Sequence, residues 1–396
     1  MITITDKRNC SGCTACANIC PKHCIQMKAD NEGFLYPDID ECQCIKCKAC
    51  ESVCPIQNPI AEKQTVQKAY LVQHKDEKVR LDSSAGGAFT AIATIILQKG
   101  GVVFGAAYDE NFHVRHEYVE TVDDLKKFRN SKYVQSEIGN SFSLVKGFLQ
   151  QGRWVCFSGT PCQIEGLYKF LKRPCEKLIL VDVVCHGVPS PLIWDKYLEY
   201  QNVSGDRPEN IRFRDKFYGY KYSTMSIIRK EKTEYHAGSQ LDPMLRAFFS
   251  DICDRPACYN CKFKKRYRVS DITIWDCFSV YNFDEKMDDD KGTTRVLCQN
   301  GKGNEVIKEA EKYAVCKEVS ADDLVKGVRE MFESVKINEK REIFFNDAQQ
   351  MNGTVLFENY YPITFKVKIK TQIRKFLLVT GMYRIAKKIL NKMRGR

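Results

Sequence analysis

Two cysteine runs with one shared spacing constrain this chain more than any other feature. They read Cys10-x-x-Cys13-x-x-Cys16-x-x-x-Cys20-Pro21 and Cys44-x-x-Cys47-x-x-Cys50-x-x-x-Cys54-Pro55. The second run repeats the first at an offset of 34 residues, from Cys10 to Cys44. The repeat predicts two similar half-modules around a pseudo-twofold axis. Half of the 20 cysteines fall within the first 54 residues, so sulfur chemistry is concentrated there.

This spacing is typical of bacterial ferredoxins with two [4Fe-4S] clusters, in which the last cysteine of each run serves the other cluster. Structural zinc usually takes two C-x2-C pairs, and disulfides need an oxidising compartment, so both alternatives fit poorly. Cys24 and Cys42 lie outside the pattern, and we interpret them as packing residues or spare thiols. We expect one cluster on Cys10, Cys13, Cys16 and Cys54, and a second on Cys44, Cys47, Cys50 and Cys20.

The 396-residue chain is long enough for two or three domains. We expect an α+β, ferredoxin-like dicluster domain over residues 1–60, with a short hairpin strand near residues 33–37. A polar linker over 57–67 leads into a second domain over 68–345. There, apolar runs alternate with amphipathic stretches, which predicts an α/β domain with a mixed sheet. The expected strands are 102–108, 113–119, 153–157 and 178–184, and the expected helices 86–98, 134–150, 161–171, 304–312 and 321–335.

The remaining residues, 346–396, form a basic amphipathic tail. From residue 363 to 396 there are eleven Lys or Arg and no Asp or Glu, which accounts for almost all of the net charge of +12. A basic amphipathic helix can lie on an anionic membrane surface or bind an acidic protein; the alternative is a helix packed on its own domain. The expected apolar face is Phe376, Leu377, Val379, Ile385, Ile389, Leu390 and Met393, with Lys387, Lys388 and Lys392 opposite.

The first residues show no apolar secretory segment, and no stretch approaches the length of a transmembrane helix. Oxygen-sensitive clusters without an export signal imply a reducing compartment. We therefore expect a cytoplasmic protein, with peripheral attachment at the inner membrane face as the further option that the basic tail offers.

Four further segments carry candidate chemistry. Residues 83–90 (SSAGGAFT) place glycines at a helix start, where free N–H groups favour a phosphate. Residues 157–163 (FSGTPCQ) place Cys162 at a helix N-terminus, which stabilises a thiolate. Residues 182–187 (DVVCHG) follow a buried strand, where ligands of open α/β sheets bind. The fourth segment is Cys253-x4-Cys258-x-x-Cys261. Each has a simple alternative, namely a helix cap, a buried core thiol or half of a zinc site.

Taken in order along the chain, these segments resemble the beta-subunit family of coenzyme F₄₂₀ hydrogenases and dehydrogenases. The matching stretches are SSAGGAFT, SKYVQSEIGNSF, FSGTPCQIEGL, DVVCHGVPSP and RPACYNCKFKKRYRVSDIT. Members of that family bind FAD and a [4Fe-4S] cluster in this domain, and some carry a fused two-cluster ferredoxin. The resemblance therefore implies that the α/β domain binds a flavin.

The resemblance also implies site residues. A third cluster would be held by Cys162, Cys185, Cys258 and Cys261, with Cys253 as a rival for the fourth position. The chain departs from the family at WDCFSV (275–280), where Cys277 adds another candidate ligand. The flavin would be lined by Ser83, Ser84, Gly86, Gly87, Thr90, Lys132 and Tyr133.

We thus expect a ferredoxin-coupled, flavin-dependent oxidoreductase. Single electrons would pass from the ferredoxin clusters through a third cluster to FAD, and on to a two-electron acceptor, with ferredoxin or another redox protein as partner. His186 is a candidate proton donor, and a structural histidine at a strand end is the alternative. The rival function is a non-catalytic electron-transfer subunit that docks onto a separate oxidoreductase. A zinc-stabilised nucleic-acid binder fits the ferredoxin spacing poorly. The substrate, the use of coenzyme F₄₂₀, the direction of electron flow and the oligomeric state stay open.

Overall fold

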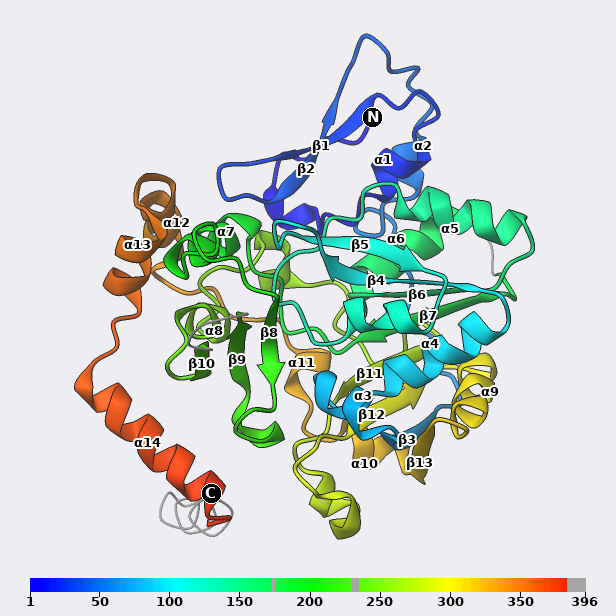
Figure 1. The fold of residues 1–396 in the computed structure, drawn as a ribbon. Helices are drawn as coiled ribbons and strands as arrows, with labels where there is room; N and C mark the ends of the chain where they lie inside the picture. Colours follow the sequence, from blue (N-terminus) through cyan, green and yellow to red (C-terminus); the bar gives the residue numbers. More distant parts are fainter. Residues whose placement is uncertain (173–174, 230–234, 383–396) are drawn as a thin grey trace.

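The computed structural model describes residues 1–172, 175–229 and 235–382 (Figure 1). Its first part is a small module in which β1 (Ile25–Ala29) pairs antiparallel with β2 (Leu35–Ile39). Two short helices, α1 (Ala15–Ile19) and α2 (Ala49–Ser52), belong to the two cysteine runs. Each begins after a residue in the left-handed conformation, Thr14 and Lys48, with φ of 60° and 59°. Because these two residues are equivalent in the 34-residue repeat, the backbone reflects the internal repeat of the sequence.

The largest element is an eight-stranded sheet in the order β13-β3-β12-β11-β7-β6-β4-β5. Its central strands β4, β6, β7 and β11 pair in parallel, and the outer strands pair antiparallel. The expected mixed α/β sheet is therefore confirmed. The strands are β3 (Lys68–His74), β4 (Val102–Tyr108), β5 (Val114–Val119), β6 (Val155–Gly159), β7 (Leu178–Val183), β11 (Ile272–Asp276), β12 (Thr294–Cys298) and β13 (Ala314–Val319).

Helices cover both faces of this sheet, and the strand sequences alternate between the two layers. In β6, Cys156 packs toward α4 (Ala88–Gln98) and α9 (Gly301–Ala310), whereas Val155 and Phe157 pack on the other face. That second face is covered by α5 (Ser141–Gln150) and α6 (Pro161–Leu171). Central strands buried on both faces read as continuous apolar runs, which is why the sequence reveals β4, β6 and β7 clearly. The fourth central strand, β11, was not expected from the sequence.

A second core lies beside the sheet. A three-stranded antiparallel sheet packs there with four helices around Trp194 and Tyr197, which are both almost fully buried. The sheet comprises β8 (Asn210–Asp215), β9 (Thr224–Ile228) and β10 (Tyr235–Gly238), and the helices are α7 (Pro191–Tyr200), α8 (Pro243–Phe249), α12 (Arg341–Gln350) and α13 (Gly353–Tyr360).

This second core corrects one boundary. Ala348, Leu356 and Phe357 are buried in it, so residues 346–360 belong to the packed body and not to a tail. Beyond them, α14 (Phe365–Val379) is separate from the sheet layers (Figure 1). The expected face residues Ile385, Ile389, Leu390 and Met393, with Lys387, Lys388 and Lys392, lie outside the described residues.

Two expected helices are also shorter than the sequence pattern indicates. Residues 134–138 form no helix, and Glu137 instead pairs with Arg115 of β5; α5 starts only at Ser141, after a turn in which Gly139 has φ of +54°. The stretch 321–335 divides into α10 (Ala321–Val325) and α11 (Arg329–Phe332), separated by Gly327 with φ of +74°. The remaining elements are α3 (Glu77–Asp82) and the 3₁₀ turns Lys7–Asn9, Asp123–Phe128, Tyr220–Tyr222, Pro256–Asn260, Val280–Asn282 and Glu285–Met287. No described helix is long and apolar enough to cross a membrane.

The cysteine-rich module is anchored to the rest of the chain at several places, two of which are the β1–β2 turn and the approach to α1. At the β1–β2 turn, Phe34 is fully buried in the second core, and Glu32 forms a bidentate ion pair with Arg341 (2.6 and 2.8 Å). Just before α1, the Cys13 side chain approaches α6 so closely that a Cβ at Gly166 would lie 2.9 Å from Cys13 Cβ. The module is thus held firmly against α6 and α7.

A Gly166→Ala change tests this second anchor. In an open helix, replacing glycine by alanine gains about 1 kcal/mol of stability. Here the new methyl group meets Cys13 Cβ and Sγ at 2.9 and 3.0 Å, and overpacking of this kind costs about 1–3 kcal/mol. We expect thermal unfolding of the anaerobically purified protein to show a lower Tm for Gly166→Ala.

Gly147→Ala is the matched control, because Gly147 also lies inside a helix but its Cβ would meet nothing within 4 Å. It should keep or raise the Tm. Equal gains for both variants would contradict the close contact between α1 and α6.

Candidate functional site: three cysteine pockets

The first pocket gathers cysteines from both runs. It is lined by Cys10, Cys13 and Cys16 of the first run and by Cys54, the last cysteine of the second. Thiols from both runs thus converge in the crossed arrangement that the repeat predicts. Four converging sulfurs are the donor set that an iron–sulfur cubane requires. These residues therefore suit a [4Fe-4S] cluster.

The second pocket holds the complementary set with one addition. Cys20 comes from the first run and Cys44, Cys47 and Cys50 from the second, and Cys24 also lines the pocket. The Sγ atoms of Cys20 and Cys24 lie 3.4 Å apart. Cys24, interpreted from sequence as a packing residue or a spare thiol, is thus a fifth thiol beside this cluster position. The Cys-Pro-x-x-Cys spacing from Cys20 to Cys24 was the available signal.

The third pocket brings together cysteines that are far apart in the sequence. Cys162 lies in the first turn of α6, Cys185 follows β7, and Cys258 and Cys261 belong to the loop before β11. All four line one pocket, as the resemblance implies for a third cluster. The two rival ligands lie elsewhere: Cys253 and Cys277 are fully buried in two separate apolar cores.

The third pocket is apolar but flanked by cations. Burial raises the pKa of Cys162 to about 11 and that of Cys185 to about 12. Such thiols stay protonated near neutral pH unless a metal displaces the proton. Arg255, Lys264 and Arg268 also line the pocket, and cations there offset the negative charge of four thiolates. The residues present therefore fit a metal–sulfur group.

Arg255 connects the first pocket with the third. Its side chain is fully buried, and its Nε donates to the Cys10 carbonyl (2.7 Å) while Nη2 lies 3.6 Å from Cys10 Sγ. Nη1 donates to Gln135 Oε1 (2.8 Å), and Nη2 also donates to the Leu35 carbonyl (2.9 Å). The guanidinium stacks over Tyr36, 4.3 Å from the ring centroid. One charged group thus bridges both cysteine sites.

His186 lies at the rim of the third pocket with two acidic neighbours. Its Nε2 is 2.7 Å from Asp251 Oδ1, and a nearby oxygen belongs to Asp254. Asp254 is fully buried, and among the described residues neither of its carboxylate oxygens has a hydrogen-bond partner. Burial, reinforced by the charge of Asp251, raises the pKa of Asp254 to about 8. The site thus has a histidine that is hydrogen-bonded and partly accessible, beside a carboxyl group that favours its neutral form.

The residues expected to line a flavin divide into two groups. Ser84 Oγ lies 2.9 Å from Ser131 Oγ and accepts from the Ser131 amide (2.7 Å), which joins the two sequence segments that the resemblance paired. Gly87 precedes α4 with φ of +84°, and no side chain caps that helix. By contrast, the other three expected residues of segment 83–90 face inward. Ser83 Oγ donates to the Val79 carbonyl, the Gly86 amide donates to Thr294 Oγ1, and Thr90 is buried in α4.

Lys132 and Tyr133 follow Ser131 directly. The Lys132 ammonium donates to three backbone carbonyls of its own loop, at 3.1 to 3.3 Å, and lies over the Tyr108 ring. Burial lowers the pKa of Lys132 to about 7. Tyr133 stacks on Phe248 with ring centroids 4.3 Å apart, and Phe248 in turn contacts His186 at 4.8 Å. Aromatic contacts thus link this loop to the rim of the third pocket.

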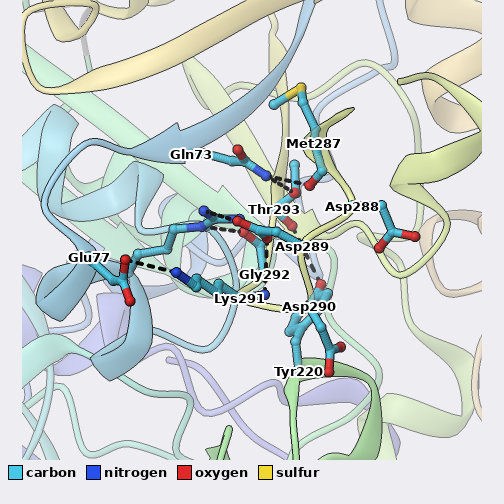
Figure 2. A network of polar contacts seen from close by, with 12 residues as sticks. Gln73, Glu77, Tyr220, Met287, Asp288, Asp289, Asp290, Lys291, Gly292 and Thr293 are labelled. Carbon is cyan, nitrogen blue, oxygen red and sulfur yellow. Dashed lines mark hydrogen bonds and ion pairs between the residues drawn. The ribbon is translucent and has the colours of Figure 1, made fainter. Parts of the chain in front are cut away.

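A loop beneath the glycine segment holds it in place. Figure 2 shows Asp289, Lys291 and Gly292 of this loop, with the Lys291–Glu77 ion pair at 2.8 Å. Arg80 binds Asp289 with two nitrogens and donates from Nε to the Gly292 carbonyl (2.8 Å). A Cβ at Gly292, where φ is +97°, would lie 2.6 Å from the Ala85 carbonyl oxygen. Only glycine allows this close support of residues 83–87.

Sequence reasoning missed the residues that connect these sites. Arg255, Gln135 and Phe248 carry no motif of their own, and their roles arise only when distant segments meet. Arg255 begins the segment RPACYNC, which belongs to the family resemblance. The sequence gave no indication that the Arg255 side chain contacts Cys10.

Two family models match parts of this chain. Residues 9–58 match the 4Fe-4S dicluster domain, and residues 152–323 match the C-terminal domain described as coenzyme F420 hydrogenase/dehydrogenase, beta subunit. No curated protein matches the chain.

One matching solved structure is that of the F420-reducing [NiFe] hydrogenase complex from Methanosarcina barkeri, determined after xenon derivatization. The match has 15% identity and a TM-score of 0.46, and covers 76% of this chain and 94% of that chain. A structural similarity of this degree says nothing further about the site. From the family matches, the chain contains a 4Fe-4S dicluster domain over residues 9–58, followed over residues 152–323 by the C-terminal domain of the coenzyme F₄₂₀ hydrogenase/dehydrogenase beta-subunit family.

Proposed function

We propose that this protein is a flavin-dependent oxidoreductase with three [4Fe-4S] clusters, two in the dicluster domain and one in the third pocket. The clusters would exchange single electrons, and FAD would pair them for a two-electron acceptor. The ligands of the third cluster would be Cys162, Cys185, Cys258 and Cys261. Ferredoxin or another redox protein is the expected electron partner.

The observation that carries this proposal is the contact of Arg255 with both cysteine sites. Electron transfer between centres requires short, ordered paths, and Arg255 reaches Cys10 while lining the third pocket. Gln135 strengthens this junction, because its side chain also donates to the Ser11 carbonyl (3.2 Å). The dicluster domain therefore presents its first cluster position, rather than its second, to the third pocket.

The residues around Ser84 support a flavin on the other side of the third pocket. The loop 131–135 contacts Ser84 at its start and Arg255 at its end. The unfilled N-terminus of α4 at Gly87 offers free backbone N–H groups and the positive end of the helix dipole, which suit a flavin phosphate. Ser84, Gly87, Lys132 and Tyr133 are the expected contacts, and Ser83, Gly86 and Thr90 would support the loop from behind.

His186 would supply or accept the proton that a two-electron reaction requires. Asp251 holds the ring through a 2.7 Å hydrogen bond, and such a partner fixes the tautomer and orientation. Phe248 lies between His186 and Tyr133, so the proton would be handled at the side of the pocket that faces the loop of Lys132.

The alternative is a non-catalytic subunit that passes electrons to another chain, as in a multi-subunit hydrogenase. Reduction of a soluble two-electron acceptor by the isolated, flavin-loaded protein separates the two: turnover favours the enzyme, and its absence with intact clusters favours the subunit. Whether that acceptor is coenzyme F₄₂₀ rests on the family name alone.

Metal analysis of anaerobically purified protein tests the third cluster. Three cubanes contain about twelve iron atoms per chain, at four per cluster. We expect Cys258→Ser to lower the iron content by about four atoms, because the cluster loses one thiolate ligand. Cys316→Ser, at a cysteine that lines none of the three pockets, is the matched control and should retain all iron. About eight iron atoms in the unaltered protein would exclude the third cluster.

Flavin binding tests the second half of the proposal. We expect Lys132→Met to weaken FAD binding about tenfold, equivalent to about 1.4 kcal/mol, because it removes a half-buried cation beside Ser131. Since the pKa of Lys132 is lowered to about 7, its charge is lost as pH rises through that value. FAD affinity of the unaltered protein should therefore fall as pH rises through neutrality.

The Lys132→Met variant should lose this dependence of FAD affinity on pH. Fluorescence titration of flavin at several pH values measures both effects. Lys127→Met, which alters an exposed lysine of the same loop, is the control. Equal flavin affinity of the two variants would remove Lys132 from the site, and no flavin binding by any form would end the flavoprotein proposal.

A further inference from the structure

Helix α14 exposes an apolar stripe along its length. Phe365, Ile369, Ile373 and Phe376 are 78, 44, 56 and 59% exposed. Their spacing of three or four residues places them on one face of the helix. Thr371, roughly on the opposite side, is buried (4%). The apolar face therefore points away from whatever covers Thr371.

The composition of this helix is strongly basic. Within α14 the sequence holds Lys366, Lys368, Lys370, Arg374 and Lys375 and no acidic residue. At the helical angle of about 100° per residue, the exposed Lys368 lies beside the edge of the stripe that Phe365 forms. The helix that carries the apolar stripe is thus strongly basic, and the sequence beyond α14 adds six further Lys or Arg.

An exposed apolar stripe on a strongly basic helix has one environment that satisfies both its apolar residues and its cations. The boundary of an anionic bilayer takes apolar side chains among its acyl chains and attracts lysine and arginine at its headgroups, each worth about 1 kcal/mol. A bilayer-crossing role is excluded for α14, since no described helix is long and apolar enough to span. An acidic protein surface would pair with the cations of α14. It would leave Phe365 and Ile373 next to carboxylates instead of burying them.

We propose that α14 lies in the plane of an anionic lipid membrane, with Phe365, Ile369, Ile373 and Phe376 inserted at the boundary between headgroups and acyl chains. The helix would thereby hold the iron–sulfur protein at the membrane surface. This attachment is separate from the cysteine pockets and from the residues around Ser84.

Flotation of the full-length, anaerobically purified protein with lipid vesicles tests the proposal. The protein should float with vesicles of phosphatidylcholine and phosphatidylglycerol, and at least about tenfold less with vesicles of phosphatidylcholine alone. The double variant Ile369→Asp/Ile373→Asp should lose at least about tenfold of its binding to the anionic vesicles. Both positions are exposed, so the variant should keep its cluster absorption and its Tm.

Ile337→Asp is the matched control, because Ile337 is also exposed (63%) but lies outside α14. It should float like the unaltered protein. Lack of flotation of the unaltered protein, or equal flotation of the double variant, would overturn the proposal. If the protein were retained on immobilised polyglutamate but did not float with vesicles, the proposal would be overturned, and an acidic partner protein would be favoured. Flotation needs neither electron transfer nor flavin, so its failure would leave the proposed function standing.

Discussion

The buried guanidinium of Arg255 is the interaction on which the arrangement of the sites depends. A fully buried cation is costly unless its donors are paired, and here all three guanidinium nitrogens find acceptors from three separate segments: Cys10, Leu35 and Gln135. Removing any one segment would leave donors of a buried charge without partners. The arginine therefore fixes the dicluster domain, the loop 131–135 and the third pocket in one geometry.

Close backbone approaches complete this arrangement. Gly12, with φ of +71°, passes so near Gln135 and Arg255 that a Cβ would lie 2.5 Å from Gln135 Nε2. Gly33 lies equally close to the Leu192 amide, where a Cβ would come within 2.7 Å. Glycine at these positions allows the small module to sit directly on the larger one. The cost of ordering a metal-rich module is thus offset by apolar burial of Phe34 and by the Glu32–Arg341 pair.

Much of this could be predicted from sequence, for physical reasons. Cysteine spacing predicts cluster ligands because only a few backbone conformations can place four thiolates around one cubane. The resemblance to the family selected the four cysteines that line the third pocket. The central strands β4, β6 and β7 were evident because they are apolar and largely buried on both faces, whereas the shorter β11 gave no such signal. The predicted start of the helix at Val134 was wrong. Val134, Ile138 and Phe142 have helical spacing, but Val134, Ser136 and Ile138 are the buried positions of a non-helical segment in which every second residue is buried. Contacts between distant segments, like those of Arg255, produce no periodic pattern in the sequence and could not be predicted from it.

The most direct measurement of the central claim is the electron paramagnetic resonance spectrum of the fully reduced, anaerobically purified protein. The proposed third cluster, when reduced, should interact magnetically with the cluster expected in the first pocket, giving a broadened spectrum that simplifies when Cys185 is replaced by serine. A spectrum equal to the sum of two isolated ferredoxin clusters, unchanged by that substitution, would contradict the account.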